Sequence, residues 1–320
     1  MRVGVIFPGQ GSQVVGMGVD VAHAYPAAKQ CFTAAKTMLG YDLLAVCAEG
    51  PAEKLTETRY AQPAIFVTNV ALAKAVGDAL RPAAGAGHSF GEYCALTLAG
   101  ALAFETALSL VNQRGLAMHR AAGLANGAMA AVLGLDPDAL RAAVARAVEN
   151  GAGRVQLANF NAPGQIVISG DAAAVRAAGE YATEAGAKRV VPLNVSGAWH
   201  STLMDPAREE FAPHVADATV FPPRFPVISN VDAQPYTDAE QIKANLTRSV
   251  TDEVRWHDTA LALVGHGLDL IVEFGASPVL APMFKRIEGA PKAITVSDAA
   301  GVEKLRAQLA NSAEPEPARG

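Results

Sequence analysis

The stretch GHSFG, residues 87–91, has the pattern G-x-S-x-G and lies between two segments of different character. Residues 83–86 are small and uncharged, as in a buried strand, and residues 92–99 contain good helix formers and no breaker. A strand, a turn with glycine on both sides and a helix together predict a nucleophile elbow, which exposes the hydroxyl of Ser89. The start of the helix would offer backbone N–H groups to a developing oxyanion. The pattern alone fits an ordinary strand–helix turn equally well.

The composition describes a compact chain with room for more than one domain. The chain has 320 residues, of which 51% are hydrophobic and only 18% are charged, and its net charge is −5. This charge argues against a general nucleic-acid binder, although an acidic protein partner would need only a local basic patch. No uncharged run is long and apolar enough to cross a membrane, and the first residues do not resemble a signal peptide.

The cysteines indicate the compartment. Cys31, Cys47 and Cys94 are an odd and irregularly spaced set, with no C-x-x-C pair and no metal-ligand spacing. Isolated cysteines of this kind usually serve as small core residues, and their thiols stay free in a reducing compartment. We therefore expect a cytoplasmic protein without a bound metal.

The beginning of the chain predicts a strand that ends at a glycine-rich loop. Residues 3–7 are apolar, and the loop FPGQGSQ at residues 7–13 has neither the G-x-G-x-x-G nor the GK[ST] pattern of nucleotide-binding loops. Open α/β sheets place their sites at the carboxyl ends of strands, where this loop would lie. Residues 14–80 predict mainly helices, including an amphipathic helix that begins near Val67 and ends near Leu80.

One charged residue interrupts the apolar face of the helix predicted after Gly100. Ala107, Val111, Arg114 and Met118 recur at offsets of four, three and four, so all should face inward. An arginine in such a place can extend its head to solvent or pair with a buried carboxylate. It can also be a fixed guanidinium that binds a substrate carboxylate through two hydrogen bonds.

The pattern changes between residues 126 and 195. Strands are predicted at 128–135, 155–160, 165–169 and 189–195, with helices after the capping residues Asp136 and Asp171. The order β-α-β-β-α-β is that of the ferredoxin-like arrangement, and the segment interrupts a longer pattern. We interpret it as an inserted subdomain.

The earlier pattern then resumes, with strands predicted at 225–229, 268–274 and 294–296 and a helix from residues 275–278 to about 287. We therefore predict an α/β fold in which residues 1–125 and 196–311 form a large α/β-hydrolase-like catalytic domain around a parallel sheet. Residues 126–195 form the ferredoxin-like subdomain. Residues 312–320 have the composition of a disordered tail.

A serine nucleophile needs a base, and the chain offers seven histidines. His88 adjoins Ser89, but neighbouring side chains on a turn usually diverge. His200 lies in a loop rich in small residues where the chain returns from the inserted segment, which favours it. The pattern does not exclude the remaining five, which are His23, His119, His214, His257 and His266.

Eight motifs, in order, make the chain resemble the malonyl-CoA:acyl-carrier-protein transacylases and related acyltransferase domains of polyketide synthases. The resemblance covers about residues 3–297. The motifs are FPGQGSQ at 7–13, YAQP at 60–63, GHSFGEY at 87–93, QRG at 113–115, GAMAAVLGL at 127–135, NAPGQIVISG at 161–170, VSGAWHSTLM at 195–204 and PVISNVDA at 226–233.

The resemblance implies roles for the matching residues. Ser89 would be the nucleophile and His200 the general base, as a dyad without an acid. Backbone N–H groups of Gln10 and Phe90 would form the oxyanion hole. Arg114 would bind the free carboxylate of the malonyl group.

Three further positions follow from the same resemblance. Gln62 matches a polar residue near the pocket. Ser249 occupies a position where the family often has glutamine and where a backbone carbonyl orients the histidine, so serine should preserve that function. Trp199 stands where malonyl-selective relatives usually carry phenylalanine. Its larger ring either excludes α-substituted malonates or swings aside and reshapes the pocket.

The implied reaction is a ping-pong transfer of a malonyl group from malonyl-CoA, through a malonyl-serine, to the phosphopantetheine thiol of an acyl carrier protein. No metal or redox cofactor is implied. Because carrier proteins are acidic, we expect a basic rim, with Lys188, Arg189, Lys285 and Arg286 as candidates; for each of them alone, ordinary surface charge is an equally good interpretation. We expect a monomer that binds neither nucleic acid nor a membrane.

Three alternatives remain at this stage. The first is a serine hydrolase that removes stalled acyl groups from carrier proteins, against which Arg114 argues. The second is a discrete acyltransferase that serves a polyketide synthase with another extender unit, which Trp199 leaves open. The third, an inactive carrier-protein-binding subunit, conflicts with the intact set of Ser89, His200 and Arg114.

Overall fold

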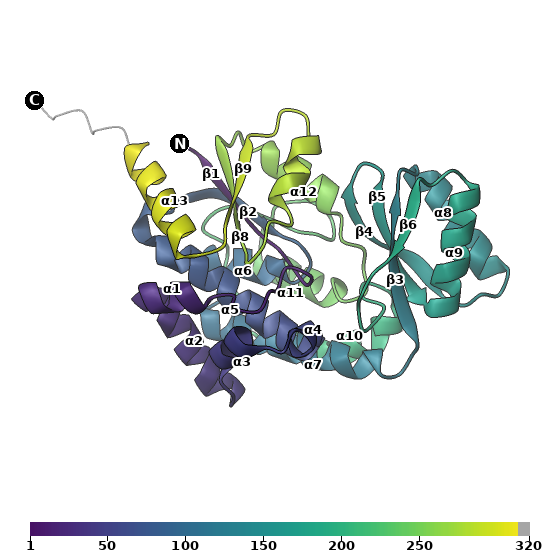
Figure 1. Cartoon of the computed structure of the whole chain (residues 1–320), viewed down its shortest axis with the longest axis horizontal. Helices are drawn as coiled ribbons and strands as arrows, with labels where there is room; N and C mark the ends of the chain where they lie inside the picture. Colours follow the sequence, from purple (N-terminus) through teal and green to yellow (C-terminus); the bar gives the residue numbers. More distant parts are fainter. Residues whose placement is uncertain (313–320) are drawn as a thin grey trace, which may run out of the picture.

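The structure, a computed structural model, describes residues 1–312 and has two lobes (Figure 1). The large lobe is built from both ends of the chain, and the small lobe is a continuous central segment, coloured teal. The predicted disordered tail lies outside the described residues except for Ser312, which follows the last helix. The proposed domain boundaries at residues 125/126 and 195/196 stay a prediction.

A parallel sheet of five strands forms the centre of the large lobe. The strand order is β7-β2-β1-β8-β9, and every neighbouring pair is parallel. All five strand segments predicted for this lobe are present, which confirms the α/β class. They are β1 Val3–Phe7, β2 Pro82–Gly87, β7 Val227–Ile228, β8 Leu270–Phe274 and β9 Lys292–Val296.

The register of this sheet brings two predicted loops together. Strands β1 and β2 are neighbours, and Phe7 pairs with Gly87 at their carboxyl ends. The loop after Phe7 and the turn at Ser89 therefore leave the sheet side by side, at the edge where parallel α/β sheets form their sites.

Helices cover both faces of the large sheet, because alternate strand residues point to opposite sides. Val5 and Phe7 pack in one core with α5, while Ile6 packs in another with Trp256 of α12. The helices before the inserted segment are α1 Val19–Ala24, α2 Pro26–Leu39, α3 Leu43–Glu49, α4 Ala52–Thr56, α5 Thr58–Val76, η1 Gly77–Ala79, α6 Gly91–Leu98 and α7 Phe104–Ala122. Those after it are η2 Thr202–Met204, α10 Asp205–Ala216, α11 Ala239–Arg248, α12 Trp256–Val264, η3 Ala281–Arg286 and α13 Ala299–Asn311.

Helix α5 corrects one prediction. It begins at Thr58 rather than near Val67, contains Pro63, and is buried on nearly all sides. An amphipathic helix was predicted here, but α2, α6, α7 and α13 pack around α5 and leave little of it at the surface. A helix that is apolar on nearly every side usually lies in the core of a protein, as α5 does here.

The small lobe has the predicted β-α-β-β-α-β order. Its sheet is antiparallel with the order β4-β5-β3-β6, which is the ferredoxin-like arrangement, and it has a hydrophobic core of its own. Asp136 caps α8 as predicted, whereas the carboxylate of Asp171 accepts a hydrogen bond from the backbone of Arg154 instead. The elements are β3 Gly127–Leu133, α8 Pro137–Glu149, β4 Val155–Ala162, β5 Gln165–Asp171, α9 Ala172–Glu184 and β6 Arg189–Pro192.

Two further segments differ from their predictions. Strand β6 ends at Pro192, so residues 193–195 leave the sheet and line the cavity described below. The helix predicted from residues 275–278 is instead a 3₁₀ helix, η3. The segment that leads into η3 is held by Glu273 of β8. This fully buried carboxylate accepts hydrogen bonds from the backbone N–H groups of residues 279–281.

Among the described residues, no single helix is long and apolar enough to span a membrane. Helices α2 and α3 reach the required length and composition only together, as a pair bent by 110°.

Candidate active site

The turn at Ser89 has the geometry of a nucleophile elbow. Ser89 has a φ of 54°, in the left-handed region that non-glycine residues rarely adopt. A Cβ on Gly87 would collide with the backbone of Gly91, and one on Gly91 would collide with the carbonyl of Phe7. The glycines are therefore required by the close approach of β1, β2 and α6.

A buried asparagine holds the elbow in this conformation. The side-chain oxygen of Asn230 accepts a hydrogen bond of 2.7 Å from the backbone N–H of Ser89, and its amide nitrogen donates one of 2.7 Å to the carbonyl of Gly87. Asn230 is only 1% exposed. Sequence reasoning assigned it no role, although it lies within the motif PVISNVDA.

Ser89 and His200 form a hydrogen-bonded pair. The Oγ of Ser89 lies 2.8 Å from Nε2 of His200, and Nδ1 of His200 lies 3.1 Å from the backbone carbonyl of Asp252. A carbonyl can only accept, so Nδ1 carries the ring proton and Nε2 is free to accept the proton of Ser89. No carboxylate side chain takes part in this contact.

Two backbone carbonyls act on the ring of His200, that of Ser249, as the resemblance implies, and that of Asp252, which was not predicted. The hydrogen bond from Nδ1 goes to Asp252, three residues further along the chain. The carbonyl of Ser249 acts on the same ring more weakly, and its hydroxyl donates to Leu246. The chain turns back after α11, and this turn brings the later carbonyl in front of the ring.

His200 is strongly biased towards its neutral form. Burial is the largest cause, followed by the charge of Arg114 and then His88, and together they lower the pKa of His200 from 6.5 to about 3. The carbonyls of Asp252 and Ser249 oppose this shift. A neutral imidazole at ordinary pH is the form that a general base requires.

Arg114 places a buried guanidinium beside the hydroxyl of Ser89. It is 1% exposed; Nη1 donates to Oε1 of Gln62 at 2.9 Å and Nη2 lies 3.5 Å from Oγ of Ser89. Within residues 1–312 no carboxylate forms an ion pair with it, and its Nε has no hydrogen-bond partner. Two of the interpretations given above for an arginine on an apolar helix face are thus excluded: the guanidinium of Arg114 neither extends to solvent nor forms an ion pair with a buried carboxylate.

The nearest buried acid does not serve as a counter-ion. Burial raises the pKa of Glu92 to about 8, despite a hydrogen bond of 2.6 Å from the hydroxyl of Tyr236. Burial thus favours the protonated form of Glu92, which weakens this acid as a counter-ion for Arg114.

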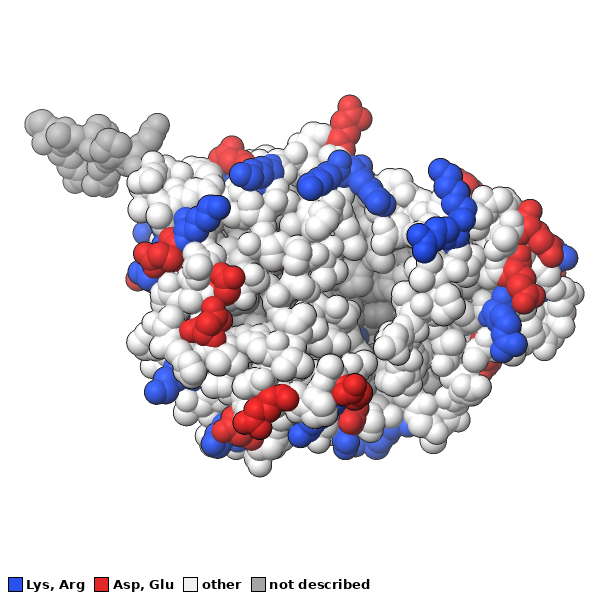
Figure 2. Space-filling model, in the orientation of Figure 1, with Lys and Arg blue, Asp and Glu red and all other residues white. Residues whose placement is uncertain are grey.

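A cavity of about 220 Å³ lies between the two lobes, and Figure 2 shows the hollow between them. Its walls include Ser89, His200 and Arg114. Gln62 does not reach the cavity: it is fully buried behind Arg114 and orients that guanidinium. The predicted substrate contact is thus a support for the arginine.

Two backbone donors line the cavity with the dyad. Gln10 and Phe90 both border it, and within the described chain neither backbone N–H has a hydrogen-bond acceptor. The loop that carries Gln10 is shaped locally, because Gly11 N–H donates to the side chain of Gln13 at 2.8 Å. Unpaired N–H groups beside a nucleophile have the character of an oxyanion hole.

Trp199 borders the same cavity. Its side chain is buried, and the ring lies so close to Gly197 that a Cβ there would come within 2.7 Å of it. The Nε1–H of Trp199 has no partner among the described residues. Gly197 therefore provides the space in which the large ring packs.

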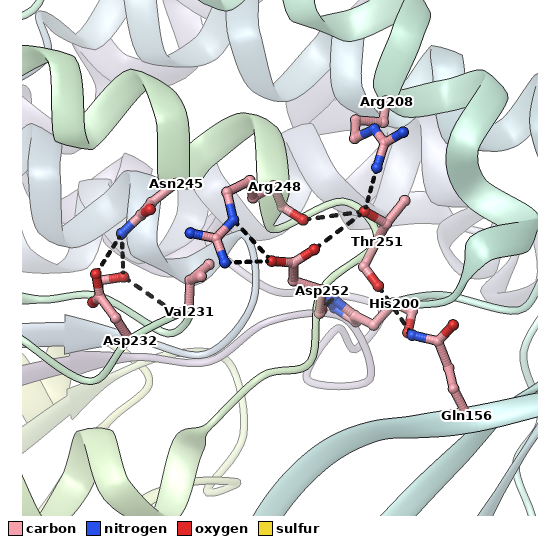
Figure 3. Close-up of polar contacts among 10 residues, drawn as sticks. Gln156, His200, Arg208, Val231, Asp232, Asn245, Arg248, Thr251 and Asp252 are labelled. Atoms are coloured by element: carbon pink, nitrogen blue, oxygen red, sulfur yellow. Dashed lines mark hydrogen bonds and ion pairs between the residues drawn. The ribbon is translucent and has the colours of Figure 1, made fainter. Parts of the chain in front are cut away.

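Residues of the small lobe hold the catalytic segments from the other side. Figure 3 shows Gln156 of β4 reaching His200 and Thr251, whose carbonyls lie 3.4 and 3.3 Å from its Nε2. Its Oε1 accepts from the backbone of Thr202 at 3.0 Å. Across the lobes, Nε2 of His88 also contacts Oδ1 of Asn161 at 2.8 Å, which shows His88 as an anchor between lobes.

The same view shows an ion pair behind the orienting carbonyl. Arg248 contacts the carboxylate of Asp252 through Nε and Nη2, both at 3.0 Å (Figure 3). Sequence reasoning found neither this pair nor Gln156. Neither of them carries a signal that the motifs made recognisable.

The four predicted rim cations lie on both sides of the cleft and are exposed. Arg286 of η3 donates to the side chain of Gln165 in the small lobe at 3.3 Å. Gln165 pairs with Leu133, which pairs with Arg189 on the next strand, and Lys188 packs against Gly134. Figure 2 shows lysine and arginine side chains on both sides of the upper end of the hollow.

Within the described residues, no group of three or more His, Cys, Asp or Glu side chains is arranged to hold a metal ion. All three cysteines are buried and free.

Known proteins resemble this chain over nearly its whole length. The acyl transferase domain family matches residues 5–311. A malonyl CoA-acyl carrier protein transacylase of Bacillus subtilis is 42% identical over 303 residues, which are 94% of this chain and 95% of that protein.

Two solved structures are similar over nearly their whole length. An acyl carrier protein S-malonyltransferase from Vibrio cholerae superposes with a TM-score of 0.90 at 40% identity, covering 95% of this chain and 100% of the other. A malonyl-transacylase solved in complex with a type II polyketide synthase acyl-carrier protein gives a TM-score of 0.91 at 37% identity, covering 96% and 100%.

Proposed function

We propose that this chain, which belongs to the acyl transferase domain family, transfers a malonyl group from malonyl-CoA to the thiol of an acyl carrier protein. The named activities of its relatives support the substrate and the acceptor. The observation that carries the proposal is Arg114, a buried guanidinium without a carboxylate partner, 3.5 Å from Oγ of Ser89.

In the first half-reaction, Ser89 attacks malonyl-CoA. Nε2 of His200 accepts the hydroxyl proton as Oγ bonds to the thioester carbon. The charge that develops on the carbonyl oxygen is stabilised by the N–H groups of Gln10 and Phe90, and such donors contribute roughly 10²–10³-fold each. The C–S bond then breaks, His200 returns the proton to the sulfur, and coenzyme A leaves a malonyl-serine ester.

In the second half-reaction, the phosphopantetheine thiol of the carrier protein replaces coenzyme A. His200 accepts the thiol proton, the sulfur attacks the ester carbon, and Ser89 leaves with the proton. Arg114 holds the malonyl carboxylate by a two-point contact throughout, which fixes the ester against random attack by water. Both steps are acyl transfers and balance without a metal or redox cofactor.

The same proposal assigns the partner surface and the setting. Lys188, Arg189, Lys285 and Arg286 would bind the acidic carrier protein, which their position around the cleft supports. The three buried free thiols support a reducing compartment, and we propose a cytoplasmic monomer.

The proposal is tested by the mass of the intact protein after brief incubation with malonyl-CoA, methylmalonyl-CoA or acetyl-CoA. We expect a malonyl adduct that is absent in Ser89→Ala and at least tenfold slower to form in Arg114→Ala, because the variant loses a charge-assisted contact.

Two outcomes would redirect the proposal. Release of coenzyme A without an adduct would make water the acceptor and the protein a hydrolase. An adduct from methylmalonyl-CoA alone would keep the mechanism and indicate an extender unit accommodated by the Trp199–Gly197 arrangement.

A further inference from the structure

We propose that Thr58 is a positioning residue that links the arginine clamp to the oxyanion loop through a single chain of hydrogen bonds. This inference rests on the proposed function of Arg114 and Gln10. Thr58 is the first residue of α5 and is fully buried. Its hydroxyl contacts one side chain on each side of the site.

The chain of hydrogen bonds is continuous. The hydroxyl of Thr58 lies 3.0 Å from Oε1 of Gln10 and 2.8 Å from Nε2 of Gln62. Oε1 of Gln62 accepts from Nη1 of Arg114 at 2.9 Å, and Nη2 of Arg114 lies 3.5 Å from Oγ of Ser89. These hydrogen bonds join the loop after β1, helix α5 and helix α7 around Ser89.

The arginine determines the direction of the hydrogen bonds that Gln62 makes in this chain. A guanidinium has donors only, so Gln62 must turn its oxygen towards Arg114 and its NH₂ group towards Thr58. The hydroxyl of Thr58 must then accept from Gln62, and its own proton goes to Oε1 of Gln10. The hydroxyl at position 58 accepts on one side and donates on the other, which an apolar side chain of the same shape cannot do.

Thr58 is also held rigidly. The backbone of α5 approaches α7 so closely that a Cβ on Gly115, the residue after Arg114, would lie 3.1 Å from the carbonyl of Thr58. The hydroxyl of Thr58 therefore occupies a fixed point between the two groups. We infer that it sets the side chain of Gln10, and with it the loop whose N–H faces the cavity, relative to the guanidinium.

The test compares two substitutions on the same helix. Thr58→Val keeps the shape and removes the hydroxyl, whereas Thr68→Val removes another buried hydroxyl of α5 that has no hydrogen-bond partner. We expect Thr58→Val to slow formation of the malonyl adduct about tenfold to a hundredfold, because the buried amide of Gln62 and the partly buried side chain of Gln10 both lose the hydroxyl. Thr68→Val should stay within about twofold, and Thr58→Ser should recover most of the rate.

A double-mutant cycle separates positioning from a merely structural role. If the hydroxyl acts through the chain, Thr58→Val should cost little once Arg114→Ala has broken it, so the two effects should be strongly non-additive. Additive effects, or a Thr58→Val variant that loads as fast as the parent, would overturn the inference. If the parent protein formed no malonyl adduct, the proposed function would fail instead, which keeps the two failures distinct.

Discussion

His200 lies between groups that change its proton affinity in opposite directions. Burial and the charge of Arg114 lower the pKa of its imidazole, while the carbonyl of Asp252 raises it. The unfolded chain has neither influence. The balance keeps Nε2 unprotonated in the empty site and available to Ser89.

The lowered pKa of His200 predicts an unusual pH dependence of malonyl loading. With the pKa of His200 lowered to about 3, the neutral base persists as the pH falls through 6.5. The second-order rate constant for malonyl loading should therefore stay nearly constant between pH 7 and 5, measured by release of coenzyme A in single-turnover experiments. A fall in this rate constant centred near pH 6.5 would show that the ring titrates as an ordinary histidine.

The elbow is an arrangement of three elements rather than of one residue. Strand β1, strand β2 and helix α6 meet where neither Gly87 nor Gly91 has space for a side chain. The left-handed φ of Ser89 is maintained by this contact and by the two hydrogen bonds of Asn230. Backbone strain at such a site persists only when the surrounding structure holds it.

At this scale we predict the effect of Gly91→Ala. Its methyl group would meet the carbonyl of Phe7, which belongs to the central strand and cannot move freely. We expect the free energy of unfolding in urea to fall by about 3 kcal/mol or more, with loss of adduct formation. As a control, Gly123→Ala should change little, since its Cβ would meet only the carbonyl of Arg120, at 3.3 Å. Equal stabilities for the two variants would contradict this account.

The two lobes act together because the site is assembled between them. The large lobe supplies Ser89 and Arg114, and β4 of the small lobe holds the segments of His200 and Thr251 through Gln156. The four cations of the rim likewise come from both lobes, Lys188 and Arg189 from the small lobe and Lys285 and Arg286 from the large one. A partner that docks there contacts both lobes at once.

For the whole molecule we predict that reversing the charges of the rim slows the second half-reaction and leaves the first unchanged. Lys285→Glu combined with Arg286→Glu should slow transfer to the carrier protein about tenfold, with a smaller difference at high salt, because acidic partners are attracted electrostatically. Loading from malonyl-CoA should be spared. Lys29→Glu, on α2, is a matched exposed control. Equal loss in both half-reactions would mean that these residues do not bind the carrier protein.

The sequence by itself predicted most of the strands and helices and a candidate nucleophile, Ser89. Strand, turn and helix signals around Ser89 lie within a few residues of one another, and the cap at Asp136 and the β-α-β-β-α-β order are equally local. Short-range patterns of this kind reflect backbone sterics and periodicity, which act between near neighbours. The resemblance added Gln10, His200 and the malonyl clamp.

Only the tertiary structure decided how these residues are held. Asn230 contacts Ser89 across 141 residues, Thr58 contacts Gln10 across 48, and the carbonyl of Asp252 contacts His200 in addition to that of Ser249. The burial of α5 on all sides and the unpaired state of Arg114 also depend on what packs around them. Contacts between distant segments carry no local pattern, because they form only when the sheet brings the ends of separate strands to one edge.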